Sequence, residues 1–314
     1  MTTDVMGAPV RHRIGRDGSF ALRTLSGSVR LHGTDGDEVI LKAASEHGEP
    51  PALVVRRFAG GMHVEPERRG KSCLGATFGV DLPDVHFDVE LPRGTRVEIN
   101  SVSADISGSE LDGDQSYKLV SGDLELTGIG GRLDAKSVSG DMRLRADGPL
   151  EVDVVTTSGD LHVEGSRLEF LRMRSVSGNA TVIGGLAAGP QHRVETVSGD
   201  LRLEPTGGLT LEASGPIVGL RSAIGGQTAS RRGRRGLVVG NGGAQLRFRS
   251  MSGEVSVDEP TGRDVRQAAS AVSADEPDPQ ADQRSSLDIL RAVERGELDV
   301  DEAARLLSED EDRA

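Results

Sequence analysis

A short string recurs six times between residues 101 and 201, and this repetition constrains the fold more than any other feature. Each copy is a variant of Ser-Val-Ser-Gly-Asp followed by a hydrophobic residue. The small residue of the string is Ala in the first copy and Gly in the others, at positions 104, 122, 140, 159, 178 and 199. The steps of 18, 18, 19, 19 and 21 residues are typical of a stacked repeat architecture.

Hydrophobic and polar residues alternate within each copy, which indicates a β-strand with one buried face. In the second copy we expect Val120 and Leu124 on the buried side, and Ser121 and Asp123 on the exposed side. Glycine-rich turn signals follow each strand, and a second alternating stretch, such as 150–154, follows the turn. Each repeat therefore contains two or three short strands.

The repeat length favours an all-β fold, a β-solenoid with coils of about 19 residues. At about 3.3 Å per residue, one repeat traces roughly 60 Å, and coils would stack about 4.8 Å apart. The glycines would then form a ladder without Cβ atoms, and a bulky side chain there should break the stack. The alternative is an antiparallel meander or sandwich in which each repeat is a hairpin.

Composition and pattern divide the chain into four parts. Residues 10–95 form an N-terminal β segment that caps the exposed edge of the solenoid, with strands expected at 20–31 and 39–43. Residues 96–257 form the solenoid itself. We expect Gly215 and Gly253 to continue it, since 38 residues separate them, which is two steps of 19. Residues 258–285 are a disordered acidic linker.

Residues 286–308 predict a small C-terminal helical hairpin. Gly296 ends the first helix, and Asp299 with Glu302 forms a capping box for the second. Two helices of about ten residues bury too little surface to be stable alone, so we expect them to dock on a protein partner or on a second copy. The predicted docking residues are Leu287, Leu290, Val293, Leu298, Leu306 and Leu307.

The repeated strings, preceded by Phe87-Asp88-Val89-Glu90-Leu91-Pro92-Arg93-Gly94-Thr95, resemble the bacterial putative-adhesin β-strand-repeat family of unknown function. The likeness extends from about residue 20 to 257. The tail 289–307 is similar to a SHOCT-like short helical module. The first resemblance implies an interaction or envelope-associated role without established catalytic residues, and the second implies oligomerisation or docking.

Charge and hydropathy exclude several classes of protein. The net charge of -13 argues against general nucleic-acid binding, which depends on many Lys and Arg. We find no signal-like apolar run near the N-terminus and no 18 consecutive apolar residues, so we expect no transmembrane segment and a cytoplasmic location, with surface or envelope association as the alternative. Cys73 is the single cysteine, which excludes an internal disulfide.

The repeated acidic residues are the first candidate site. If the coils stack in register, a row of carboxylates forms, and like charges about 4.8 Å apart repel by roughly 1 kcal/mol in water. We favour a structural role, in which each Asp accepts backbone N–H bonds in its turn, over a calcium ladder. The residues of that ladder are Asp105, Asp123, Asp141, Asp160 and Asp200, with Asn179 interrupting it.

Other candidate sites are weaker. The neighbouring serines form a hydroxyl ladder rather than a set of nucleophiles, because no histidine recurs beside them. The basic residues Arg231, Arg232, Arg234 and Arg235 predict a solvated loop, with local docking to nucleic acid or peripheral contact to anionic lipid as the sharper hypotheses. The seven histidines show no ligand spacing, so we predict no metal site, no cofactor and no catalytic residue.

The sequence thus predicts a non-enzymatic β-repeat scaffold or adhesin-like binding protein with a docking tail. One alternative is a carbohydrate-binding or carbohydrate-active β-helix protein, although the repeats hold few of the aromatic residues that sugar platforms require. Another alternative is a cytoplasmic regulator of an envelope response.

Overall fold

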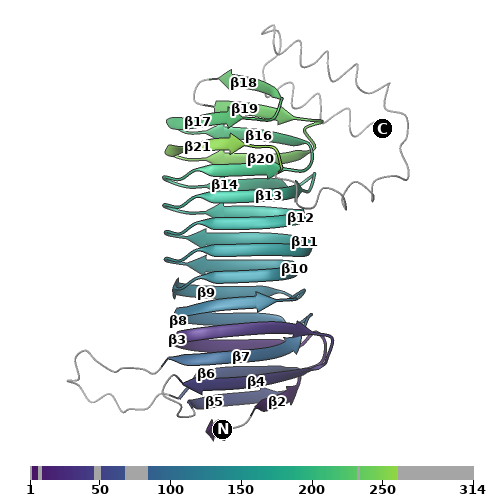
Figure 1. Ribbon diagram of the computed structural model, residues 1–314, viewed down its shortest axis with the longest axis vertical. Helices are drawn as coiled ribbons and strands as arrows, with labels where there is room; N and C mark the ends of the chain where they lie inside the picture. Colours follow the sequence, from purple (N-terminus) through teal and green to yellow (C-terminus); the bar gives the residue numbers. More distant parts are fainter. Residues whose placement is uncertain (1, 6–8, 46–50, 68–83, 232–233, 261–314) are drawn as a thin grey trace, which may run out of the picture. The chain divides into compact units, whose positions relative to one another are not determined.

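The computed structural model describes residues 2–5, 9–45, 51–67, 84–231 and 234–260, and the backbone alone for residues 2–5 and 231. The described residues belong to one compact unit, and residues 261–285 of the predicted linker and the whole predicted helical hairpin lie outside them. The described part is all-β. Successive coils stack on one another, and each coil contributes one strand to each of two layers, which we call sheet I and sheet II (Figure 1).

Sheet I contains the strands that follow the Ser-Gly-Asp turn. In spatial order they are β2 (Val10–Arg13), β4 (Glu38–Ser45), β7 (Val85–Pro92), β3 (Ser19–Thr34), β8 (Arg96–Ser109), β10 (Leu124–Ser137), β11 (Met142–Thr156), β12 (Leu161–Arg174), β13 (Ala180–Leu186), β15 (Leu201–Pro205), β21 (Ser252–Val257) and β17 (Ile217–Ser222).

Sheet II contains the strands that precede that turn, and the long strands cross from one sheet to the other. Its spatial order is β1 (Thr2–Val5), β5 (Ala52–Phe58), β6 (Gly61–Pro66), β3, β8, β9 (Gln115–Ser121), β10, β11, β12, β14 (Gln191–Glu195), β20 (Ala244–Arg249), β16 (Leu209–Ser214), β19 (Arg234–Val239) and β18 (Gln227–Arg231).

The parallel register confirms the predicted solenoid. Leu124 lies beside Met142, and Met142 lies beside Leu161, so equivalent positions of successive repeats are neighbours. Side chains from both sheets meet in one hydrophobic core, which contains Leu126 and Leu133 from the two halves of β10. A hairpin per repeat would instead give antiparallel pairs within the repeats, and the pairs between successive repeats are parallel.

Each coil turns at two places. The repeat corner lies between sheet II and sheet I and is formed by the recurring string, as at 137–141. The opposite corner lies between sheet I and sheet II, as at 109–114, 127–131 and 187–190. The repeat corner is nearly identical from coil to coil, whereas the opposite corner varies in sequence and length.

The N-terminal strands belong to the same two sheets. Ser19 pairs with Arg96 and Gly27 pairs with Ala104, so β3 is a coil in register with the first repeat. The expected strands 20–31 and 39–43 lie within β3 and β4. Beyond β3, the pairs β4 with β7, β2 with β4, β5 with β6 and β1 with β5 are antiparallel, which ends the parallel stacking.

The structure corrects the expected alternation through the repeat corner. Leu124 is buried as predicted, but Val120 is 49% exposed, because β9 ends at Ser121 and the chain turns before β10 begins. The strand that carries Val120 is therefore not the one that carries Leu124, and the period-two pattern restarts at the turn. The equivalent valines of the other repeats are exposed as well.

The structure also corrects the expected order of the last coils. Strand β20 lies between β14 and β16, and β21 lies between β15 and β17 (Figure 1). Gly253 therefore stacks directly on Gly199 and is not two coils beyond Gly215. The spacing of 38 residues is accommodated by the antiparallel hairpin of β18 and β19, which pairs with β16.

Candidate functional site

The aspartate ladder, which is Asp105, Asp123, Asp141, Asp160, Asn179 and Asp200, runs along the repeat corner. Each Oδ1 atom accepts a hydrogen bond from the backbone N–H at the equivalent position of the next coil. Asp141 donates to Asp123 at 2.9 Å, and Asp160 donates to Asp141 at 2.9 Å. At the end of the row the N–H of Glu254 donates to Asp200 at 2.8 Å. The side chains thus connect neighbouring coils.

Asn179 shows what the ladder requires of its members. Its N–H donates to Asp160 at 2.8 Å, and its Oδ1 accepts from the N–H of Asp200 at 2.9 Å. An amide oxygen thus does the same work as a carboxylate oxygen, so the ladder needs an acceptor and not a charge. The predicted structural role has a different donor from the one expected, because the N–H comes from the next coil and not from the same turn.

The predicted calcium ladder finds no support in the geometry. Among the described residues, no group of three or more His, Cys, Asp or Glu side chains is arranged to hold a metal ion. The carboxylates follow one another along a line, so each faces its neighbours above and below and does not converge with them on a common point.

A glycine is required at the repeat corner, as the sequence predicts. Gly140 has φ +119, in the left-handed region that residues with a Cβ rarely adopt. A Cβ on Gly140 would also overlap the carbonyl oxygen of Gly122, and one on Gly159 would overlap that of Gly140. From Gly122 onward the corners of successive coils consequently approach more closely than a side chain allows, whereas the first repeat has Ala104 at this position.

Hydroxyl groups close the same turn. Ser121 and Ser158 donate to the valine carbonyl of the preceding coil, both at 3.3 Å, so these two bear out the hydroxyl ladder. A second row, which the sequence analysis missed, comes two residues earlier. Its hydroxyls each donate to the carbonyl oxygen two residues further on, and its members include Ser137, Thr156, Ser175, Thr196 and Ser250. The sequence feature that could have predicted this row is the Ser or Thr at the first position of each string.

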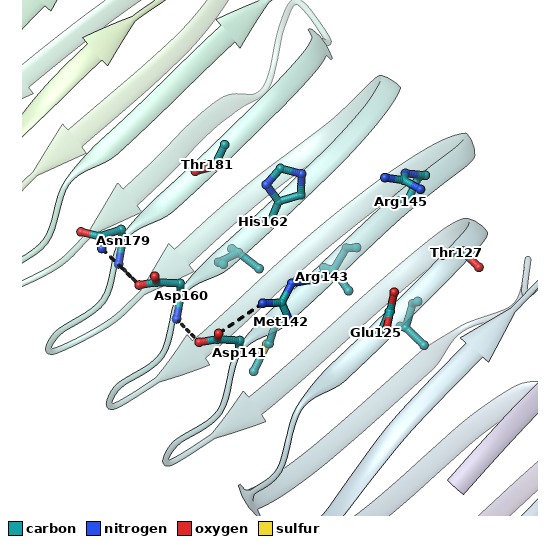
Figure 2. A pocket seen from close by; sticks show the side chains of 13 residues that line it. Glu125, Thr127, Asp141, Met142, Arg143, Arg145, Asp160, His162, Asn179 and Thr181 are labelled. Carbon is teal, nitrogen blue, oxygen red and sulfur yellow. Dashed lines mark hydrogen bonds and ion pairs between the residues drawn. The ribbon is translucent and has the colours of Figure 1, made fainter. Parts of the chain in front are cut away.

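A shallow depression lies on sheet I beside the aspartate ladder (Figure 2). Its volume is about 370 Å³. Glu125, Arg143, His162 and Thr181 occupy equivalent positions of β10 to β13 and form a row across it. The row juxtaposes acidic, basic and hydroxyl groups. No Phe, Tyr or Trp belongs to the described lining, so the depression has no aromatic platform on which a sugar ring could stack.

Both arginines that line the depression form ion pairs, one with a carboxylate of the lining and one with a carboxylate beyond it. Arg143 lies 3.5 Å from the Oδ2 atom of Asp141, and Arg145 lies 3.0 Å from Glu164. Asp141 also accepts the N–H of Asp160 through its other oxygen. The polar groups are therefore held in place, as a rigid recognition surface requires.

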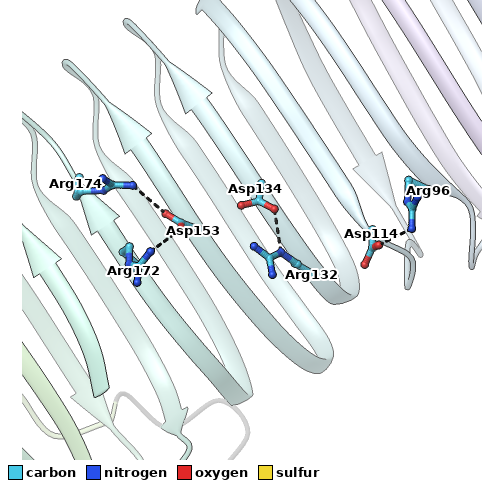
Figure 3. A network of polar contacts seen from close by, with 7 residues as sticks. All are labelled: Arg96, Asp114, Arg132, Asp134, Asp153, Arg172 and Arg174. Carbon is cyan, nitrogen blue, oxygen red and sulfur yellow. Dashed lines mark hydrogen bonds and ion pairs between the residues drawn. The ribbon is translucent and has the colours of Figure 1, made fainter. Parts of the chain in front are cut away.

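Sheet II presents a second polar surface with several ion pairs (Figure 3). Asp153 lies 3.3 Å from Arg172 and 3.9 Å from Arg174, and Arg132 lies 3.0 Å from Asp134. Pairs as exposed as Arg132 with Asp134 contribute little stability. A hydrogen bond from Asn100 lowers the pKa of Glu98 on the same face.

Single buried polar residues hold the opposite corner. The amide nitrogen of Gln115 donates to the carbonyls of Leu111 at 3.2 Å and Gly130 at 3.4 Å, and the hydroxyl of Tyr117 donates to Gln115 at 3.1 Å. Burial raises the pKa of the Tyr117 hydroxyl. This side chain therefore remains neutral and acts as a hydrogen-bond donor.

His192 performs the same task further along the stack. It is fully buried, its Nδ1 atom accepts from the N–H of Leu171 at 3.1 Å, and its Nε2 atom lies 2.9 Å from the carbonyl oxygen of Ala187. This geometry assigns the proton to Nε2. Burial lowers the pKa of the imidazole, against the opposing effect of the Ala187 carbonyl.

The remaining predicted residues are only partly described. Arg234 lies 3.5 Å from Glu212, and Arg235 is exposed. Arg232, the side chain of Arg231 and the docking residues of the tail lie outside the described part of the chain. No helix of the described residues is long and apolar enough to cross a membrane.

Comparison with known proteins agrees with this fold. Residues 84–204 match the family model of the Toastrack DUF4097 domain, so this segment is similar to that family. No curated protein matches the chain.

Three solved structures of bacterial proteins are similar to it at low identity. A putative lipid binding protein from Parabacteroides distasonis is 14% identical, with a TM-score of 0.35, over 81% of this chain and 97% of that one. A putative adhesin from Bacteroides fragilis is 10% identical, with a TM-score of 0.31, over 80% and 96%. A putative cell adhesion protein from Clostridium sporogenes is 9% identical, with a TM-score of 0.23, over 80% and 99%.

Proposed function

We propose that the protein is a non-enzymatic binding scaffold that presents the polar depression of sheet I to a protein partner. The observation that carries this proposal is the use of the repeated acidic residues. Each one accepts the N–H of the next coil, and Asn179 does so equally well without a charge. Groups that are engaged in holding the coils together are poorly suited to general acid or base catalysis.

The depression has the properties of a recognition surface. Its side chains come from four neighbouring strands, so their spacing is fixed by the backbone ladder. Its mixture of paired charges and hydroxyls suits the polar groups of a folded partner. Without aromatic residues in its described lining, a carbohydrate ligand is less well matched.

Site-specific photocrosslinking in the native host tests this proposal. A photoreactive residue at Thr181 lies in the depression, whereas one at the exposed Glu151 lies on sheet II and serves as the control. We expect one discrete crosslinked protein from position 181 and none from position 151. Polysaccharide cleavage by the purified chain that Asp160→Asn abolishes, with unfolding unchanged, would contradict the proposal.

We further propose that the C-terminal residues dock the scaffold on a partner or on a second copy. The support is the amphipathic spacing of their sequence, as at Leu290 and Leu306. The double variant Leu290→Asp and Leu306→Asp in the full chain should lose the complex that the wild-type chain forms in a native-host pull-down. An unchanged complex would show that another surface is responsible.

A further inference from the structure

The exposed side of the repeat corner carries a row of apolar side chains that a threonine interrupts in one layer. Val120, Val138 and Met251 are 49%, 50% and 60% exposed. We call this row the valine ridge. Its members are Val102, Val120, Val138, Val176, Val197 and Met251. Thr157 occupies the single intervening layer, because its carbonyl accepts the N–H of Ser177 just as the carbonyl of Val138 accepts the N–H of Ser158.

Backbone hydrogen bonds fix the spacing of the ridge. The N–H of Ser139 donates to the carbonyl of Val120 at 2.9 Å, and the N–H of Ser198 donates to that of Val176 at 3.0 Å. Seven layers at about 4.8 Å per step extend over roughly 29 Å. Apolar side chains in a straight row of this length are unusual on a surface that is otherwise charged, and they indicate an interface.

Charge differs between the two sides of the ridge. On sheet II, two residues before the ridge, lies a cationic row in register: Lys118, Lys136, Arg174 and Arg249, with Asn100, Val155 and Glu195 in the other three layers. On sheet I, three residues after the ridge, lies the aspartate ladder with Glu254 at its end. The order across the surface is cation, apolar, anion, as in Lys136, Val138 and Asp141.

We propose that the valine ridge joins two copies of this chain side by side in a parallel dimer. A two-fold axis along the stacking direction places each layer opposite the same layer of the second copy and reverses the order across the ridge. Lys118 then faces Asp123 of the other copy, Lys136 faces Asp141, and Arg249 faces Glu254. Only the layer of Glu195 and Asp200 sets like charges against each other.

Other occupants match this surface less well. In an antiparallel dimer, with the axis across the ridge, the cationic rows face each other and so do the aspartates, which is repulsive. An anionic lipid surface would attract the cationic row but repel the ladder on the other side. The ridge is not part of the depression, so dimer formation does not depend on the function proposed above.

Sedimentation equilibrium of the full chain tests the dimer. We expect twice the monomer mass for the wild type, and a dissociation constant raised by about 100-fold or more in the triple variant Val120→Ser, Val138→Ser and Val176→Ser. These side chains are half-exposed, so the variant should unfold at the wild-type denaturant concentration. The matched control is Val238→Ser, which removes a valine that is 37% exposed on β19, opposite Thr210 and away from the ridge.

Disulfide crosslinking reports the orientation. In a Cys73→Ser background, the cysteine of Val120→Cys should form a disulfide with the same cysteine of the second copy, because the two-fold axis brings equivalent layers together. In an antiparallel dimer Val120 would instead face the far end of the ridge, so crosslinking only between Val120→Cys and Val197→Cys overturns the parallel arrangement. A monomeric wild type, an unchanged triple variant, or ridge-dependent binding of a monomer to anionic vesicles overturns the dimer.

Discussion

The two corners of the coil solve the same structural problem in different ways. Each must satisfy the backbone groups of a turn while keeping the next coil in register. The repeat corner uses nearly the same exposed string in each repeat, with a glycine in all but the first, a hydroxyl and an acceptor such as Asp141. The opposite corner uses buried polar residues that occur once each, Gln115 in one coil and His192 in another.

This difference teaches how a repeat protein divides its sequence constraints. At the repeat corner each part contributes little alone and recurs many times. At the opposite corner one side chain satisfies several carbonyl or amide groups that are remote from water, so its loss leaves them without a partner. We therefore expect a substitution at the opposite corner to lower the free energy of unfolding more than one at the repeat corner, except where the glycine itself is replaced.

The largest expected effect is that of Gly140→Val. The valine would have to adopt a left-handed φ, and its Cβ would overlap the carbonyl oxygen of Gly122. We therefore expect a loss of about 3 to 5 kcal/mol in the free energy of unfolding. Gly148→Ala at the opposite corner is the control, because the nearest atom lies 3.7 Å from its Cβ. Equal losses from both variants in urea denaturation would erase the distinction between the corners.

Gln115→Leu should have the next largest effect. It removes the Gln115 partner of the Gly130 carbonyl and of the Tyr117 hydroxyl, whereas the Leu111 carbonyl keeps the N–H of Gly130, and we expect a cost of about 2 to 3 kcal/mol. Tyr117→Phe removes only the last of these bonds and should cost less. Denaturant titration measures both, and a Gln115→Leu variant as stable as the wild type would show that the buried network does not hold this corner.

His192 should make the opposite corner sensitive to acid. Because burial lowers its pKa below the ordinary value of 6.5, the unfolded chain binds the proton first as the pH falls. Its contribution to stability is thus complete above pH 6.5 and is lost as the pH falls toward the lower pKa of the folded state. Protonation of Nδ1 would also set a donor against the N–H of Leu171.

Thermal unfolding between pH 7.5 and 5 measures this effect. His192→Gln should be less stable at neutral pH but should lose less stability on acidification than the wild type does. His162→Gln, on the surface of sheet I, is the control and should keep the wild-type slope. Parallel pH curves for wild type and His192→Gln would mean that another group causes the acid sensitivity.

The smallest effect is expected from the aspartate ladder. Asp141→Ala removes the acceptor for the N–H of Asp160 at a solvent-accessible corner, so we expect a loss of about 1 kcal/mol. Asp141→Asn should be close to the wild type, as Asn179 already serves in the next but one coil. A larger loss from Asn than from Ala would show that the charge, and not the acceptor, is what the repeat corner needs.

The amino-acid sequence by itself determined the repeat length and the need for glycine at the repeat corner, and it favoured stacked coils over hairpins. These properties are periodic, so they can be recognised from the spacing alone. A Cβ at Gly140 would meet the backbone of the preceding coil, and a Cβ at the equivalent Gly159 would do the same. The row of aspartates was predictable for the same reason. The backbone N–H that donates to each aspartate was not predictable, because aspartate suits a hydrogen bond from the next coil as well as one within its own turn.

Tertiary structure alone decided three other features. Val120 is exposed because the chain turns between it and Leu124, and the alternation of residue types does not reveal where a strand ends. Strand β20 lies between β14 and β16, although β16 comes before it in the sequence. There its backbone N–H and C=O groups pair with those of both strands. His192 and Gln115 hold the opposite corner because three-dimensional packing brings remote carbonyls to them. No spacing in the sequence records those contacts.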